Sequence, residues 1–194
     1  TSSNSYSYGR VFDLVAGSNN IEISGNSING VLTSSSDNSI SAIYSYAANN
    51  NIVISDNDLY NGSFGIYFDD ASSNGTGNEI LNNNISNCYN GGIRLTNQDQ
   101  IIVEGNNIAT KLSGGYTNQY GIYAKYCDNT LRIVANQIQV YAQSYNYGLY
   151  FYQCDGVSGS ESMIYNNFVS THNSTYRSYG IYLSNTHYCG IYNN

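Results

Sequence analysis

The sequence contains no proline and no tryptophan, and it has a single methionine, Met163. Only 10% of its 194 residues are charged, and the 6 Lys and Arg against 13 Asp and Glu give a net charge of −7. Nucleic-acid binding relies on clustered Lys and Arg, so this balance argues against a nucleic-acid partner and equally against an anionic membrane surface. No apolar run approaches 18 residues, and we therefore predict no membrane insertion.

Helical periodicity is also missing, because no segment keeps apolar residues at helical spacing for three turns, and no long helix is predicted. The abundance of Asn, Ser and Gly with 22 tyrosines is also found in disordered, prion-like tracts. Short apolar alternations argue against disorder, since they recur along the chain. The clearest are Ile21/Ile23, Ile52/Ile54 and Ile101/Val103. We interpret residues 1–194 as a single domain with its own core.

Two short patterns repeat in step along the chain. The first contains glycine, an aliphatic residue and tyrosine, and it returns every 23 to 32 residues. Its clear copies are Tyr120–Tyr123, Tyr147–Tyr150 and Tyr179–Tyr182, with looser ones around Phe12, Ile43, Ile66 and Ile93. The second, N-I-x-I-x-x-N-x-I, is complete over residues 20–28 and returns with changes over 51–59 and 100–108. Self-similarity at this period is typical of repeat architectures.

These patterns resemble the repeats of right-handed parallel β-helix proteins of the pectate-lyase-like superfamily, over about residues 11–194. The resemblance implies an all-β solenoid of about seven coils with three short strands per coil. It also implies a ladder of stacked asparagines at one tight turn, where a left-handed backbone is expected. The asparagines at that place are Asn26, Asn57, Asn83, Asn106, Asn136, Asn166 and Asn193.

Strand alternation predicts two outward columns on the glycine-containing strands. One consists of Asp13, Tyr44, Tyr67, Arg94, Tyr123, Tyr150 and Tyr182, and the other of Tyr46, Asp69, Thr96, Lys125, Tyr152 and Ser184. An exposed apolar strip usually marks a contact site, whereas stacked aromatic residues also stabilise a sheet without any ligand. Both interpretations stay open. The candidate ligand-binding residues are Tyr44, Tyr67, Arg94, Tyr123, Tyr150, Tyr152 and Tyr182.

Three charged residues of this face are weak catalytic candidates. Enzymes of the resembled superfamily act on polysaccharides along this sheet, and a lyase uses a basic residue beside a uronate carboxylate. Asp69, Arg94 and Lys125 fall on three consecutive coils, so they could serve a lyase or simply form a surface row of ion pairs. Calcium at Asp69 or Asp70 is expected only for a lyase. The face has no paired column of acids, so the hydrolase pattern is not met.

The cysteines and histidines do not predict a metal site. Cys127 and Cys154 each follow the aliphatic residue of their repeat by five positions, so they should stack in adjacent coils. A buried thiol pair and a disulfide both fit that placement. The sequence has no Cys-x-x-Cys spacing, and we interpret His172 and His187 as solvated.

We therefore predict an extracellular or cell-surface β-helix module of an adhesin- or stalk-like secreted protein. Its tyrosine-lined face would contact a polysaccharide or a neighbouring surface protein, without a cofactor. The alternatives are a polysaccharide lyase acting on a uronate-containing glycan and a passive structural spacer.

The irregular segments and the chain end add two expectations. Residues 190–194 match residues 163–167, and the sequence then stops before the next inward hydrophobe, so we expect a piece of a longer chain whose remainder completes the solenoid. Segments that lengthen the period are expected to be projecting loops. They are residues 31–41, 69–77, 109–119, 154–161 and 170–179.

Overall fold

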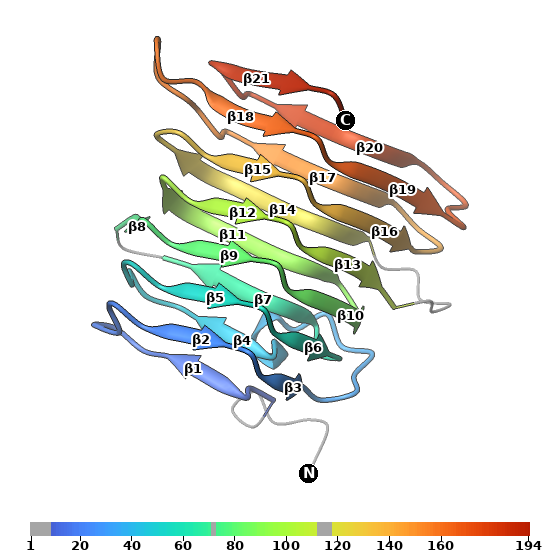
Figure 1. Ribbon diagram of the computed structural model, residues 1–194. Coiled ribbons are helices and arrows are strands. Elements are labelled where there is room, and N and C mark those ends of the chain that lie inside the picture. The colour runs from blue at the N-terminus through green and yellow to red at the C-terminus, as the bar shows by residue number, and fades with distance from the viewer. Residues whose placement is uncertain (1–8, 71–72, 112–117) are drawn as a thin grey trace.

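The computed structural model describes residues 9–70, 73–111 and 118–194, which form a parallel β-helix of three sheets (Figure 1). Sheet A contains β1 (Phe12–Leu14), β4 (Ile43–Ser45), β7 (Phe64–Asp69), β11 (Gly91–Asp99), β14 (Gln119–Asp128), β17 (Asn146–Tyr152) and β20 (Ser178–Ser184), with β8 (Gly75–Thr76) beside β11. Sheet B contains β2 (Glu22–Ser24), β5 (Val53–Ser55), β9 (Glu79–Leu81), β12 (Ile102–Glu104), β15 (Arg132–Val134), β18 (Ser162–Tyr165) and β21 (Cys189–Tyr192). Sheet C contains β3 (Ser27–Asn29), β6 (Asp58–Tyr60), β10 (Asn84–Cys88), β13 (Asn107–Thr110), β16 (Gln137–Tyr141) and β19 (Phe168–His172).

Each coil runs from sheet A through sheet B to sheet C, which confirms the expected three strands per coil. The described chain completes six coils, and β20 and β21 begin a seventh. Within the described ranges the helical structure is limited to the 3₁₀ turn η1 (Asn38–Ile40), as the missing helical periodicity predicted. The described residues contain no helix long and apolar enough to cross a membrane.

The core consists of inward columns that the strand register keeps aligned. In sheet A, for example, Ile122 pairs with Ile93 on one side and Leu149 on the other. Sheets B and C add further fully buried columns, including Ile80, Val103 and Ile133 in sheet B, and Ile85, Ile108 and Ile138 in sheet C. Burying each such side chain stabilises the fold by about 1.5–3 kcal/mol.

The asparagine ladder occupies the tight corner between sheets B and C. Asn106 represents its hydrogen bonding: its Nδ2 donates to Ile80 O at 2.9 Å and to Asn136 Oδ1 at 3.0 Å. Its Oδ1 accepts from the backbone N of Asn83 at 2.9 Å and from Asn83 Nδ2 at 3.0 Å. Each amide therefore bridges neighbouring coils, and the expected structural role of the ladder is confirmed.

Two expected members of the ladder were wrong by one position. The ladder continues from Asn136 to Asn167 and Asn194, whereas Asn166 and Asn193 directly precede them with φ of 57° and 51°. The left-handed backbone expected for the ladder residue itself belongs to this preceding residue. In other coils the position before the ladder asparagine is occupied by Gly25, Asp56 or Ala135, which also have a left-handed backbone.

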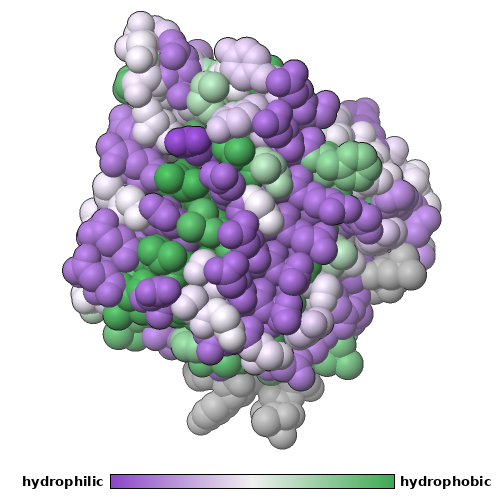
Figure 2. Space-filling view, viewed as in Figure 1, coloured by the Kyte–Doolittle hydropathy of each residue, from purple (hydrophilic) through white to green (hydrophobic). Residues whose placement is uncertain are grey.

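The longer connections lie at the other two corners, as expected for projecting loops. The connection over residues 30–42 joins sheet C to sheet A and extends from the first coil to the fourth. Its Ser36 O accepts from Asn90 Nδ2 at 2.8 Å, and its Thr33 O accepts from Lys111 Nζ at 3.1 Å. Residues 71–72 and 112–117 of two other expected loops lie outside the described ranges. Figure 2 shows the side formed by sheets B and C, which is mainly hydrophilic with a hydrophobic patch over sheet B.

Candidate functional site

The outward face of sheet A brings the predicted tyrosine column together. Its register aligns Asp13, Tyr44, Tyr67, Arg94, Tyr123, Tyr150 and Tyr182 on successive strands. The predicted second column is also aligned from Asp69 through Thr96, Lys125 and Tyr152 to Ser184. The predicted placement of these outward residues is therefore confirmed.

A further tyrosine column on the same face was missed by strict alternation. Tyr120, Tyr147 and Tyr179 lie two residues before an inward aliphatic residue, so strict alternation would turn them inward, and they were not among the predicted outward residues. A glycine separates the two in each repeat, and a Cβ built on Gly121 would lie 2.2 Å from Ile138 Cγ2 in sheet C. Because Gly121 also faces the core, the alternation shifts by one residue and Tyr120 turns outward, 5.1 Å from Tyr123 between ring centroids. The repeated tyrosine before glycine was the available signal.

Six tyrosines of coils five to seven form a continuous aromatic surface, which we name the tyrosine layer. Its members are Tyr120, Tyr123, Tyr147, Tyr150, Tyr179 and Tyr182, and all six are partly exposed. Within a column the rings are nearly parallel, as for Tyr123 and Tyr150, with centroids 4.9 Å apart and planes at 8°. Between columns they meet edge to face, as for Tyr147 and Tyr150, 5.2 Å apart at 85°. This herringbone arrangement satisfies the ring quadrupoles, and part of each tyrosine stays accessible to solvent.

The tyrosines of the first coils have different surroundings. Tyr44 and Tyr67 also stack, with centroids 5.1 Å apart, but only 9% and 3% of their surfaces are exposed. The Arg10 guanidinium lies 3.8 Å from the Tyr44 ring centroid, and Tyr67 donates its hydroxyl hydrogen bond to Asp69 Oδ2 at 2.7 Å. Burial raises the pKa of the Tyr67 phenol. These two predicted ligand-binding residues offer little ring surface to a ligand.

The three weak catalytic candidates form no ion pair with one another on this face. Asp69 accepts from Tyr67, while Arg94 lies between Tyr67 and Tyr123 in register. Lys125 Nζ lies 4.6 Å from the Tyr126 ring centroid. The ion pairs of the described residues are Arg10–Asp13 and Asp155–His187, so the alternative row of ion pairs through Asp69, Arg94 and Lys125 is wrong. Arg94 belongs to the first outward column and Asp69 and Lys125 to the second, and Asp69 pairs with neither cation.

Asp70 follows Asp69 at the corner between sheets A and B, but its carboxylate is buried. Asp70 Oδ2 accepts from Gln98 Nε2 at 2.7 Å, and Gln98 Oε1 accepts from Asn78 Nδ2 at 2.8 Å. Burial raises the pKa of Asp70 to about 7, although the hydrogen bonds from Gln98 and Gly75 oppose the shift. Asp70 therefore faces a polar cluster of the interior rather than an outward calcium site beside Asp69.

The same corner carries the cysteines in the later coils. Cys127 and Cys154 are fully buried and interact with each other, and all four cysteines are free thiols. Their Sγ–H groups donate to the Lys125 and Tyr152 carbonyls at 3.5 and 3.6 Å. The expected stacked pair is thus confirmed, as thiols rather than a disulfide.

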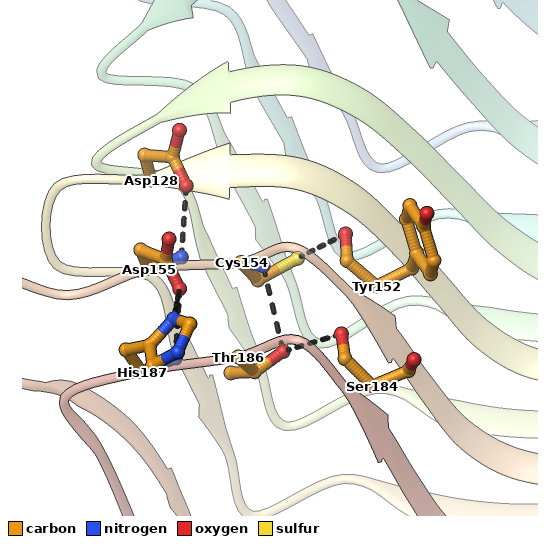
Figure 3. A network of polar contacts seen from close by, with 7 residues as sticks. All are labelled: Asp128, Tyr152, Cys154, Asp155, Ser184, Thr186 and His187. Atoms are coloured by element: carbon orange, nitrogen blue, oxygen red, sulfur yellow. Dashed lines mark hydrogen bonds and ion pairs between the residues drawn. The ribbon is translucent and has the colours of Figure 1, made fainter.

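Beside Cys154, the polar side chains of Asp128, Asp155 and His187 lie on successive coils at this corner (Figure 3). The backbone N of Asp155 donates to Asp128 Oδ1 at 2.8 Å, and Asp155 Oδ1 lies 3.0 Å from His187 Nδ1. Both His187 and Asp155 are largely exposed at this ion pair. His172 lies on sheet C, where its ring stacks on Tyr141 at 4.8 Å. Neither histidine is paired in strand register with a residue of the tyrosine layer. His187 is exposed to solvent, as expected.

Metal donors do not gather on the part of the chain that the structure describes. No three His, Cys, Asp or Glu side chains there are placed to share a metal ion. Burial raises the pKa of the Cys88 thiol to about 12 and that of Cys189 to about 11, and Cys127 is raised as well. These thiols are therefore protonated at neutral pH, whereas metal ligation needs thiolates.

Two hollows lie away from the tyrosine layer. One of about 260 Å³ is at the first coils of sheet A, between Arg10, Asp13 and Tyr46. The other, of about 410 Å³, is on the outer side of sheet B between Arg132, Met163 and the loop that contains Ser160. Neither contains a residue of the tyrosine layer, so that layer is a surface rather than the wall of either hollow.

Comparison with known proteins agrees with this architecture. Searches of curated proteins and of solved structures gave no match. A family model described as periplasmic copper-binding protein (NosD) matches residues 2–194. The family is a parallel β-helix repeat family of the pectate-lyase-like superfamily, which confirms the resemblance found in the repeats, and its periplasmic description agrees at a coarse level with the expected extracellular location. The chain belongs to the NosD family.

Proposed function

We propose that this chain is a cell-envelope β-helix module, adhesin- or stalk-like, that contacts a carbohydrate through the tyrosine layer. The observation that carries the proposal is the layer itself: six registered, partly exposed tyrosines on three successive coils. Most other outward tyrosines, such as Tyr60 on sheet C, stand outside this herringbone. Continuous aromatic surface of this kind usually marks a contact.

The chemistry of the layer suits neutral hydroxyl-rich ligands. Burial and neighbouring tyrosines raise the pKa of Tyr147 to about 12, and burial raises that of Tyr123 to about 12 against the opposing effect of Arg94. The phenols of Tyr123 and Tyr147 therefore stay protonated at neutral pH, and a protonated phenol both donates and accepts hydrogen bonds. The exposed parts of the rings supply apolar contact to the C–H faces of sugars. Because the rings repeat once per coil, a glycan lying along the solenoid axis would meet equivalent groups at each step.

Copper has no part in this proposal, although the family description names it. Copper sites use imidazole, thiolate or thioether ligands. This sequence has two histidines and one methionine, and the cysteines of the described structure are mostly buried thiols. With no grouping of three donors in the described ranges, these residues do not fit a copper centre.

The lyase and spacer alternatives make different demands on the molecule. A lyase needs a base and a charge-neutralising group at one bond, whereas the Asp69 carboxylate here accepts from Tyr67 and the two cations lie against tyrosine rings. A spacer needs only the core and the ladder, so its tyrosines would be replaceable without loss of binding. Both alternatives are therefore outcomes of one binding experiment.

The experiment screens the purified chain against neutral and acidic glycans and then measures the affinity of any ligand by calorimetry. The variants are Tyr150→Ala and Tyr182→Ala, with Tyr60→Ala as a matched control because Tyr60 is exposed on sheet C. Circular dichroism checks that each variant is folded. We expect at least a roughly tenfold loss of affinity in both layer variants and none in the control.

Other results would contradict the proposal. Binding that survives in both layer variants would move the contact elsewhere. Absence of any glycan ligand would leave the spacer. An unsaturated oligosaccharide product that disappears in Arg94→Ala would establish the lyase instead.

A further inference from the structure

We infer that the face of sheet A also holds a cationic subsite, formed by Arg94, Thr96 and Lys125, that binds one carboxylate or sulfate group of the glycan. This inference rests on the proposed function and names the class of sugar that the tyrosine layer selects. The subsite lies on β11 and β14, directly beside the layer, which begins at Tyr120 and Tyr123.

Arg94 is a cation without an acidic partner in the described structure. Its guanidinium carbon lies 4.6 Å from the Tyr123 ring centroid and 5.4 Å from that of Tyr67. Its Nε is buried and has no hydrogen-bond partner among the described residues. Arg10 offers the comparison on the same face, because it also stacks on a tyrosine but is paired with Asp13 at 2.7 Å. Arg94 therefore lacks the carboxylate partner that Arg10 has.

Thr96 and Lys125 extend the subsite along the second outward column. Thr96 lies two residues after Arg94 on the same face, is only 7% exposed, and has no hydrogen-bond partner for its hydroxyl within the described ranges. Lys125 is its neighbour in register on the next coil, and its Nζ lies 5.3 Å from the Tyr152 ring centroid. Arg94 Nε and the Thr96 hydroxyl thus lie two residues apart on one strand, both buried and both without a hydrogen-bond partner among the described residues. Buried donors and acceptors are normally paired, so this arrangement favours a bound ligand.

The charges around the subsite favour an anion. The nearest acidic side chain in register is Asp69, beside Thr96, and its Oδ2 already accepts from Tyr67. On β17 and β20 both outward columns carry only tyrosine and serine. Two cations thus face one engaged carboxylate, on a chain whose net charge is −7. The rest of the molecule would repel a long polyanion, so isolated acidic groups on an otherwise neutral glycan fit better.

The ligand chemistry follows from the donors. A guanidinium presents Nε–H and Nη–H as a planar fork that matches two oxygens of a carboxylate or sulfate. The Lys125 ammonium adds a point charge that can follow the anion on its flexible stem. The Tyr67 and Tyr123 rings lie on either side of Arg94 in strand register and contact its guanidinium. A glycan along the axis would place its acidic group at β11 and its neighbouring rings over the tyrosine layer.

The test uses a matched pair of ligands: a carboxylate-bearing oligosaccharide and the same oligosaccharide with the carboxyl group reduced to an alcohol. Affinities are measured for wild type, Arg94→Gln, Arg94→Lys and a control, Arg132→Gln, which removes a cation from sheet B. We expect wild type and the control to prefer the acidic ligand by about tenfold. Arg94→Gln should lose this preference while keeping its affinity for the reduced ligand, and Arg94→Lys should retain part of it.

A second arm reports on the subsite without any sugar. Inorganic sulfate is titrated while the Nε–H resonance of Arg94 is followed by NMR, with assignment by the Arg94→Lys variant. A saturable shift supports the subsite, and no shift up to high sulfate overturns it. Equal affinity of wild type for the two oligosaccharides, or a preference that persists in Arg94→Gln, would also overturn it. If neither oligosaccharide binds, the carbohydrate proposal fails, and the sulfate titration alone decides whether the anion subsite exists.

Discussion

The two halves of the sheet A face carry the same registered column of aromatic residues but use it differently. In the early coils Tyr44 and Tyr67 are buried, and the Tyr67 hydroxyl is fixed by Asp69. In the later coils Tyr150 and Tyr182 stack with similar spacing yet stay partly exposed. Stacking along a β-helix therefore does not by itself say whether an aromatic column serves stability or contact, because the surroundings of each ring decide.

The early coils differ from the later ones in two further features, a long connection and an arginine that lies over Tyr44. Residues 30–42 leave the first coil and are tied to Asn90 and Lys111 of the fourth. Arg10 donates to Ser39 O of this connection at 3.1 Å and also covers the Tyr44 ring. In the later coils the rings meet other tyrosines instead. The early half is thus a small satellite core, and the later half is an open surface.

The largest expected effect separates these two roles by stability. Tyr67→Ala should lower the free energy of unfolding by about 3–5 kcal/mol, because removal of the buried Tyr67 ring leaves a cavity and the hydrogen bond to Asp69 is lost. Tyr150→Ala should cost about 1–2 kcal/mol, since it loses partial burial and a few ring contacts. Urea denaturation of both variants measures the difference. Equal costs would show that the two halves are buried alike and would remove the distinction.

This contrast also shows which features of the face could be predicted from the sequence. The repeat spacing placed Tyr67 and Tyr150 in one outward column correctly, because register between coils follows from the period alone. Their different burial depends on neighbours from other coils, such as Tyr44 and Arg94 at the Tyr67 ring, and no local pattern encodes those contacts. The second tyrosine column was missed because Gly121 shifts the alternation by one residue.

Ambiguous neighbours explain the other misses. Asn166-Asn167 and Asn193-Asn194 offer two asparagines where the ladder takes one, and only the hydrogen bonds to Asn136 and Asn167 identify the second of each pair. Asp69 and Asp70 looked equivalent for calcium, yet one is outward and the other is enclosed by Gln98 and Asn78. The column positions were predictable, whereas the pairing of each polar group was not.

A second comparison lies at the corner between sheets A and B, and it predicts a pH effect. The early coils place the Asp70 carboxylate there, whereas the later coils place thiols. The pKa of Asp70 is about 7 in the folded chain against about 3.9 when unfolded, so its neutral form favours folding. That stabilisation is complete below about pH 4 and is lost as the pH rises through about 7.

Asp70→Asn tests this effect, because asparagine stays neutral and can still accept from Gln98. Between about pH 4 and about pH 8, the free energy of unfolding should fall less in the variant than in wild type. At about pH 8 the variant should be the more stable of the two. Thermal unfolding at several pH values provides the measurement. Asp128, whose pKa is also raised by burial, is present in both chains and cancels in the difference. Parallel pH profiles for the two chains would contradict the prediction.

A smaller effect concerns the tie between residues 30–42 and the fourth coil. Asn90→Ala removes the donor to Ser36 O and should cost about 1 kcal/mol. Backbone amides of residues 30–42 should then exchange hydrogen faster, while those of the tyrosine layer keep their rates. Asn84→Ala is the matched control, because its amide bonds an exposed Asp58 carboxylate on sheet C. Unchanged exchange in Asn90→Ala would mean that this connection is held without Asn90.

The smallest effect involves no change of stability and concerns the four thiols. Burial raises the pKa of Cys88 to about 12 and also that of Cys127, and Cys154 is equally enclosed, so native protein at about pH 8 should not react at these positions. Cys189 is only half-buried and should react slowly. Mass spectrometry after maleimide treatment should therefore find at most one adduct natively and four in urea. Two adducts in urea, with a third and fourth only after reduction, would contradict this prediction, because they would mean that Cys127 and Cys154 are bridged.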